Sequence, residues 1–418
     1  MKLRTSIRLV AVGAVLAAIG LAIREVRLRT ASEAVRQSLL KNFDEALDAD
    51  FAVESARFEF DGRVEAGPIT VSAPGLAQPV LECPRTILQL DLWQMLHLNK
   101  VLRRCTVLSP TIRLLYDPER GTWNFQTIQP RPGDGEVREG FLADGVEVRD
   151  ATLQLRHAKL FDDDATRTYE GIDLRLVPGS GANPGWNFSG IVAGGPVRGV
   201  RLHGYFDADS DPPLKVTYEA RGLRADEALW RLVPRGGFIW QRYRPVGDLS
   251  VSGLISQSPG RKTQYRCQVE LHSLTADAPF LPRPVRSVRG TVVVSNRGVS
   301  LRNVTGLMPA RELDPEIETP YPVQFRVGGE HRNHQESEYH VEVTDVPICR
   351  ATLEAIPDVG QQIWERLRPA GRCDVSLRLS RQREGQPLRP AVTVRLHDGT
   401  VHLPELPRPL HNVNGTIR

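Results

Sequence analysis

Residues 271–292 have the sequence LHSLTADAPFLPRPVRSVRGTV, and residues 396–417 have the sequence LHDGTVHLPELPRPLHNVNGTI. The two stretches align without a gap at an offset of 125 and share Leu-His, Leu-Pro-Arg-Pro and Gly-Thr. Upstream, IWQRYRPVG at 239–247 matches IWERLRPAG at 363–371 at an offset of 124. We interpret the pattern as one unit that occurs twice, at 215–338 and 339–418. Repeats that each leave an apolar face open are expected to stack into one elongated structure.

The second copy of the repeat is incomplete. In the first copy Gly290-Thr291 leads into a predicted hairpin that extends to Met308, whereas the matching Gly415-Thr416 is followed by only two residues. A sheet that stops within a hairpin leaves an edge strand without its partner. Two interpretations stay open: a continuation of the same chain completes the sheet, or another protein does.

Apolar and polar residues alternate through most of the chain after residue 50. This period of two predicts strands with one apolar and one polar face. Turn sequences between the runs, such as Asn296-Arg297-Gly298 and Asp398-Gly399, predict antiparallel hairpins. The predicted fold is therefore mainly β, an elongated antiparallel sheet built of repeats. Short helices are expected between the strands, at 92–97, 225–232, 348–355 and 361–367.

The amino terminus has the pattern of a membrane anchor. Residues 9–23, LVAVGAVLAAIGLAI, are uncharged and follow Lys2, Arg4 and Arg8. As a helix the run would measure about 22 Å, short for a bilayer core of about 30 Å unless the flanking arginines snorkel. We predict a retained transmembrane helix at 1–23 and an amphipathic helix at 24–50. A cleaved signal peptide is the alternative. The basic amino terminus places the rest of the chain outside the cytoplasm.

Composition excludes several classes of function. The 418 residues include 54 basic and 50 acidic side chains, so no large basic field indicates nucleic acid binding. The five cysteines form no Cys-x-x-Cys pair, which excludes a zinc ribbon or a thioredoxin-like motif. Disulfides between Cys83 and Cys105, or between Cys349 and Cys373, stay open for an oxidising compartment.

No motif indicates catalysis. The chain has no Gly-x-Ser-x-Gly, His-Glu-x-x-His or P-loop sequence. His331, His334 and His340 lie close in sequence, as do three aspartates at 162–164, but neither spacing secures a metal site. Trp240 and Trp364 occupy equivalent repeat positions, which favours a packing role where a strand begins. We therefore expect no enzyme activity, no metal and no cofactor.

Several stretches in one order resemble the AsmA-like family, which includes proteins of the AsmA, TamB and YhdP type. The first is ALDADFAVESARFEFDGRVEAGPITV at 46–71. In the second, at 88–128, a short helix precedes a strand with a Pro-x-Ile-x-Leu pattern, an acidic-Gly turn and Trp-Asn, here Pro110, Ile112, Leu114, Gly121, Trp123 and Asn124. The paired segments 145–157 and 169–178 and the helix-to-strand units at 225–255 and 348–379 complete the resemblance.

The resemblance implies a periplasmic β-groove, a long curved sheet whose concave face is apolar and holds acyl chains. On this basis residues 51–214 are an AsmA-like N-terminal β region that precedes the two repeats. The resemblance also implies phospholipid transport between the envelope membranes, or support of outer-membrane biogenesis. The protein would then be a single-pass inner-membrane protein with most of its chain in the periplasm, and membrane lipids, possible envelope proteins or a continuation of the sheet would be its partners.

The candidate groove residues are the apolar members of the clearest alternating runs. They are Leu249, Val251, Ile255, Val375, Leu377, Leu379, Val392, Val394 and Leu396. A second hypothesis is a non-catalytic assembly factor or scaffold that pairs with envelope proteins through its sheet edges. The two hypotheses differ in what they require of the inward face: a carrier needs it apolar and uncovered, whereas a scaffold would pack it closed or interrupt it with charge.

Overall fold

The structure is a computed structural model of the chain that forms two compact units, Met1–Lys159 with Asp163–Gly195 and Leu160–Asp162 with Pro196–Arg418. It describes residues 32–59, 61–74, 76, 78–91, 102–130, 144–161, 163–179, 185–207, 210–258, 261, 263–277, 284–309, 322–332, 337–354, 360–381, 386–387 and 389–417. The expected anchor at 1–23 and the expected helix at 92–97 lie outside these residues. Within them, none of the helices has the length and apolar character needed to cross a bilayer.

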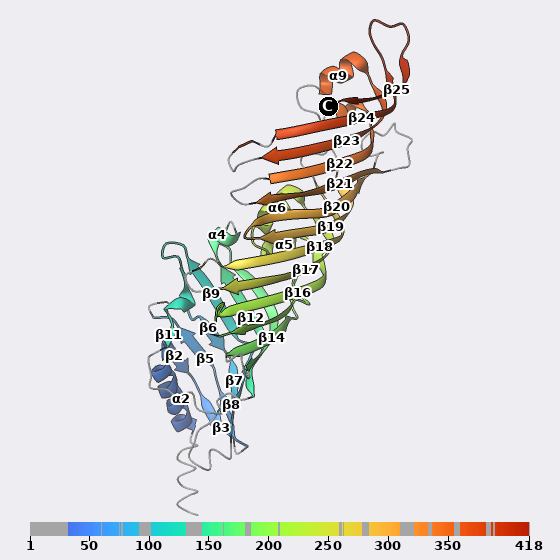
Figure 1. The fold of residues 1–418 in the computed structure, drawn as a ribbon. Coiled ribbons are helices and arrows are strands. Elements are labelled where there is room, and N and C mark those ends of the chain that lie inside the picture. The colour runs from blue at the N-terminus through green and yellow to red at the C-terminus, as the bar shows by residue number, and fades with distance from the viewer. Residues whose placement is uncertain are drawn as a thin grey trace, which may run out of the picture. The chain divides into compact units, whose positions relative to one another are not determined.

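The second unit contains a continuous antiparallel sheet in which each strand pairs with the next along the chain, as the alternation predicts. Figure 1 shows these strands side by side, in chain order from green to red. The strands are β15 (Arg201–Phe206), β16 (Leu214–Ala225), β17 (Val246–Gln257), β18 (Gln264–Ala276), β19 (Val285–Ser295), β20 (Gly298–Met308), β21 (Val323–Arg332), β22 (Ser337–Pro347), β23 (Ala370–Arg381), β24 (Arg389–Val401) and β25 (Leu410–Ile417).

The first unit contains shorter strands and is also mainly β. They are β1 (Leu47–Asp48), β2 (Asp50–Val53), β3 (Ala56–Phe58), β4 (Arg63–Ala66), β5 (Ile69–Ser72), β6 (Leu81–Cys83), β7 (Arg85–Leu90), β8 (Leu102–Leu108), β9 (Thr111–Asp117), β10 (Thr122–Trp123), β11 (Gln129–Pro130), β12 (Gly145–Arg156), β13 (Arg167–Pro178) and β14 (Trp186–Val192). A 3-10 turn, η1 (Asn124–Thr127), and a short helix, α4 (Ala158–Phe161), lie between them.

The amphipathic helix expected over 24–50 is described from Ser32 and ends at Ala46, as α2 (Ser32–Ala46). Its apolar side chains Val35, Leu39 and Leu40 pack against a buried cluster from β2 to β6. The helix stops there because Leu47–Asp48 forms a strand paired with β11. The predicted helix was therefore too long at its carboxyl end.

One strand pairing in the first unit differs from the expected antiparallel pattern. β12 runs parallel to β8 and then to β9, with Val148 opposite Val107 and Leu153 opposite Ile112. Between them Ser109 has a φ of 47°, and its N–H donates to Arg149 O at 2.8 Å. The long connection from β9 to β12 permits this parallel return, which a two-residue hairpin could not provide.

The repeat in the sequence is also a repeat of secondary structure. α5 (Glu227–Leu232) and α6 (Gly236–Tyr243) precede β17, and α8 (Arg350–Glu354) and α9 (Gly360–Leu367) precede β23. β17 and β23 start 124 residues apart, whereas β18 and β24 start 125 residues apart. Trp240 and Trp364 lie within α6 and α9 rather than at the start of a strand, which corrects that part of their expected placement.

Most of the long strands carry one extra residue, a β-bulge, at the point where the sequence alternation shifts by one. On β16 the next paired residue after Ala220 is Leu223, three positions on, whereas on the partner strand β17 the step from Val251 to Leu249 is only two positions. β20, β22 and β24 have the same step of three residues against two on their partners. The bulges contain residues of positive φ, namely Gly222, Asn303, Asp345 and Asp398. The inserted residue bends the strand and returns the next apolar side chain to the same face.

Asp398-Gly399 is therefore such a bulge inside β24, and the predicted hairpin turn at this position was wrong. The backbone N–H of Asp398 donates a hydrogen bond to a side chain of the next strand, Asn414 Oδ1, at 2.9 Å. Asp345 N donates to Asp374 Oδ1 at 3.1 Å in the same way. At these two bulges a short polar side chain thus replaces the ladder bond that the backbone N–H loses.

All five cysteines are free thiols, and burial raises the pKa of three of them, Cys105, Cys267 and Cys373. Burial raises the pKa of Cys105 to about 11, with a smaller contribution from Cys83. Burial likewise raises the pKa of Cys373 to about 11, with a smaller contribution from the Asp374 charge. Both thiols therefore stay protonated in the folded chain at a pH where an unfolded cysteine, with a pKa of about 8.5, is ionised.

We predict that the free energy of unfolding falls as the pH rises from about 8.5 to 11, because the unfolded chain releases these two protons first. Denaturant titrations at pH 8 and pH 10 measure the fall. A variant with Cys105→Ala and Cys373→Ala should show a smaller fall between the same two pH values. An equal fall in the variant would contradict the prediction.

Candidate functional site

The strand register assembles a continuous row of apolar residues across the second unit. Starting from Val251, directly paired residues on β16 to β24 are Ala220, Val251, Val269, Val292, Leu301, Gly329, Tyr339, Leu379 and Pro390. Directly opposed residues on neighbouring strands lie on the same face of a sheet. The row therefore marks one apolar face that spans these strands.

Two further rows lie on the same face, nearer to the helices. The first contains Val304, Val327, Val341, Leu377 and Val392 on β20 to β24. The second contains Phe325, Val343, Val375, Val394 and Ile417 on β21 to β25. We call the surface made by these three rows the apolar face.

All nine candidate residues lie on this face of the sheet. Val251, Leu377, Leu379, Val375, Val392 and Val394 belong to the three rows. Ile255 pairs with Val216, and Leu396 pairs with Cys373, at the two margins of the face. Leu249 is 2% exposed and Val392 is 44% exposed, and the other seven are half-buried. The apolar face is thus closed over Leu249 and open further along the sheet.

The opposite face is polar. The row beside Val251 contains Glu219, Ser252, Gln268, Val293, Ser300, Glu330, Glu338, Ser380 and Arg389, in which only Val293 is apolar. Arg378 forms an ion pair with Glu338 at 2.6 Å on this side. A sheet with one polar and one apolar face has its polar side in water.

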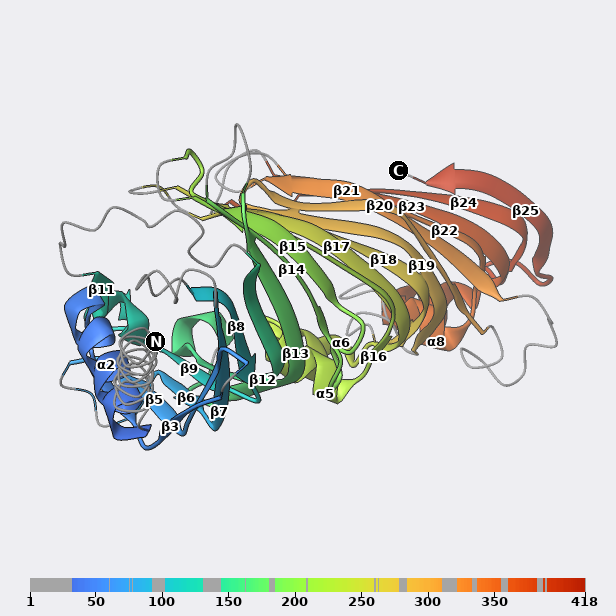
Figure 2. The ribbon, with the colours of Figure 1, turned by 90° about the horizontal axis from the view of Figure 1, so that it is seen from below.

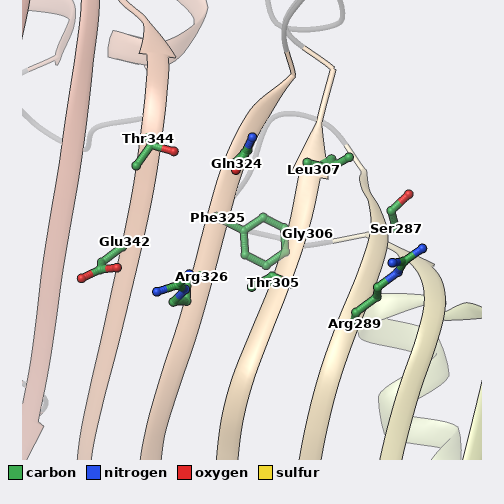
Figure 3. Close-up of a pocket in the computed structure, with 10 residues that line it drawn as sticks. All are labelled: Ser287, Arg289, Thr305, Gly306, Leu307, Gln324, Phe325, Arg326, Glu342 and Thr344. Carbon is green, nitrogen blue, oxygen red and sulfur yellow. The ribbon is translucent and has the colours of Figure 1, made fainter.

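A shallow hollow of about 610 Å³ lies over strands β19 to β22. Figure 3 shows its side chains, which include the polar-face row Thr305, Arg326 and Glu342. Arg289 adds a second positive charge beside it. The hollow contains none of the nine candidate residues, and its mixed charges indicate a hydrated surface.

The apolar face is covered at one margin by helices. Leu229 of α5 is 3% exposed and packs in one cluster with Leu249, Leu274 and Val288. Trp230 anchors α5, because its Nε1 donates to Pro245 O at 3.0 Å. Figure 2 shows the strands as curved arcs with α5, α6 and α8 on the inner side of the curve. The apolar face, on which α5 packs, is therefore the concave face.

The opposite margin of the apolar face, toward the short hairpins, carries polar groups that the sequence alternation did not single out. Tyr218 lies over Gly253 and is hydrogen-bonded to Cys267, and burial raises the pKa of both groups. Further along the same row, Val294 pairs with Val299 and Val299 pairs with His331. Two polar residues then continue the row, Ser337 and Arg381.

The histidines that lie close in sequence do not converge. His331 and Ser337 are on the apolar face, whereas His340 is on the polar face, where its Nε2 lies 3.1 Å from Glu342 Oε1. His334 lies outside the residues that the structure describes. Within the described ranges, no three His, Cys, Asp or Glu side chains are arranged to hold a metal ion.

No known protein family, curated protein or solved structure matches this chain. Any functional conclusion therefore depends on the two faces of the sheet and on the sequence itself.

We predict that the closed and open parts of the apolar face differ in stability. Leu249→Ala should lower the free energy of unfolding by about 2–5 kcal/mol, because it leaves a cavity in a packed cluster. Val392→Ala removes a side chain already 44% exposed and should cost less than about 1 kcal/mol. Denaturant unfolding of the two variants measures the difference, and equal losses would show that the face at Val392 is packed as well.

Proposed function

We propose that this protein is a non-catalytic carrier that shelters the acyl chains of phospholipids on its apolar face. In this proposal residues 1–23 anchor it in the inner membrane and the sheet lies in the periplasm, where it carries lipid between the envelope membranes or supports outer-membrane biogenesis. The location and the lipid class derive from the amino-terminal sequence and from the resemblance to the AsmA-like family.

The observation that carries the proposal is the apolar row through Val251 and Leu379. The row carries no charged residue on nine consecutive strands, and its members are apolar except for Gly329 and the hydroxyl of Tyr339. Most of them are only half-buried, so a large apolar surface stays in contact with solvent. Monomeric soluble proteins rarely expose a contiguous apolar patch of more than a few hundred Å² unless the patch binds something.

The dimensions of the face suit an acyl chain. Nine strands at a spacing of about 4.8 Å extend over about 38 Å, whereas half of a bilayer core, which one acyl chain spans, is about 15 Å. Each methylene removed from water contributes about 0.8 kcal/mol. A chain lying across the strands would meet apolar side chains along its whole length, and no charge interrupts the row from Ala220 to Pro390.

A second candidate function is supported by the last described strand. β25 pairs with β24, and its side chains are largely exposed, including Ile417 at 71%. An exposed strand of this kind can pair with a strand of another protein. In this alternative the protein is an envelope scaffold, and the apolar face would be covered by its partner.

Arginine substitutions on the two faces test the carrier function. Val251→Arg and Leu377→Arg place a charge on the apolar face and should reduce bound lipid by about 10-fold, because an unpaired charge beside an acyl chain is costly. Ser252→Arg and Ser376→Arg are the matched controls, since each is the neighbouring residue on the polar face. They should leave bound lipid unchanged. The measurement is native mass spectrometry of the full chain, with extraction and quantification of the lipids that copurify.

Two outcomes would oppose the carrier function. One is a folded wild-type chain that copurifies without lipid, which would favour the scaffold. The other is an equal effect of substitutions on the two faces. Circular dichroism of each variant establishes that a loss of lipid does not come from unfolding.

A further inference from the structure

The margin of the apolar face near the β21–β22 and β23–β24 connections carries a positive charge. Arg381, the last residue of β23, is directly paired with Ser337 and lies two residues beyond Leu379 on the same face. Tyr339, its diagonal neighbour, has a pKa that burial raises and that the Arg381 charge lowers in part. The guanidinium therefore lies at the end of the apolar rows.

Within the described residues, the groups that bind this guanidinium are an imidazole and a hydroxyl. Arg381 Nη2 donates to His331 Nδ1 and to Ser337 Oγ, both at 3.2 Å. Ser337 Oγ lies 2.7 Å from the same Nδ1, and Ser337 is 2% exposed. Neither a serine hydroxyl nor an imidazole carries a negative charge that would offset the guanidinium. The cluster is thus a net cation.

The cluster has hydrogen-bonding capacity left. Arg381 Nε is buried and has no hydrogen-bond partner. None of the carboxylates that the structure describes forms an ion pair with Arg381, whereas Arg378, three residues earlier on the polar face, is paired with Glu338 at 2.6 Å. A partly buried guanidinium without a counter-charge is costly, and its planar fork fits the oxygens of a phosphate.

We propose that Arg381, with His331 and Ser337, binds the phosphate group of an amphiphile whose acyl chains lie along the apolar face. This inference rests on the proposed carrier function and adds a headgroup site to it. The helices close the opposite margin of the face, so an amphiphile has one margin at which its charge meets a cation. The headgroup then lies near the short hairpins and its chains extend toward β16 or β24.

Binding of two lipids that differ only in the phosphate tests this inference. The full chain, in mild detergent, is titrated with dioleoyl phosphatidic acid and with dioleoylglycerol, and native mass spectrometry gives the apparent Kd of each. Wild type should bind phosphatidic acid at least about 10-fold more tightly, as expected for hydrogen bonds to a charged group. Arg381→Gln should abolish this difference and leave the Kd for dioleoylglycerol unchanged.

Two variants control for charge and folding. Arg378→Gln removes an arginine from the polar face of the same strand and should keep the wild-type preference. Arg381→Lys keeps the charge without the planar fork and should keep part of the preference for phosphatidic acid. If Arg381→Gln does not fold, a reduced preference in Arg381→Lys tests the same site.

Each remaining outcome overturns a different statement. Equal binding of the two lipids by wild type would overturn the headgroup site and leave the carrier function standing. Binding of neither lipid would overturn the carrier function itself. Inorganic phosphate that binds in an Arg381-dependent way, while neither lipid binds, would show that the site takes free phosphate and would overturn the amphiphile.

Discussion

The hydrogen-bonded register of the long strands is the constraint on which the rest of the second unit depends. A slip of one residue on any strand would turn its apolar side chains to the polar face. Val251 and Leu379 belong to one row only because each of the intervening strands keeps this register. The polar row beside them is held by the same bonds, so both faces are fixed together.

Bulges reconcile this constraint with curvature. An inserted residue bends a strand, yet a single insertion would reverse the alternation beyond it. The sequence compensates by placing two polar or glycine residues between apolar ones, as between Leu301 and Val304 or between Val343 and Val346. Side chains such as Asp374 and Asn414 bond the freed backbone N–H. The residues that interrupt the alternation of apolar and polar side chains are thus the same residues that bend the strands.

The sequence predicts the class of fold and much of the apolar face, and its failures have identifiable physical causes. Alternation locates most of the long strands, and the helices expected at 225–232 and 361–367 are α5 and α9, whereas α6 was not expected. It misplaces Asp398-Gly399, because a turn and a bulge demand the same positive φ and the same residue types. It misses the parallel β12, since periodicity within a strand carries no information on its partner. It also misses Arg381, because a charge at the end of a strand looks like an ordinary hairpin residue until the register shows which face it shares.

The contrast between Arg378 and Arg381 shows how one strand can use the same residue in two ways. On the polar face Arg378 is largely exposed and paired with Glu338, so it contributes little beyond solubility. On the apolar face Arg381 is held by His331 and Ser337, neither of which offsets its charge. Apolar side chains along a face set how much hydrocarbon can be sheltered, but they treat every acyl chain alike and fix no direction. In the proposed site the charge of Arg381 at one margin, opposite the helices that close the other, would give an amphiphile one favourable orientation.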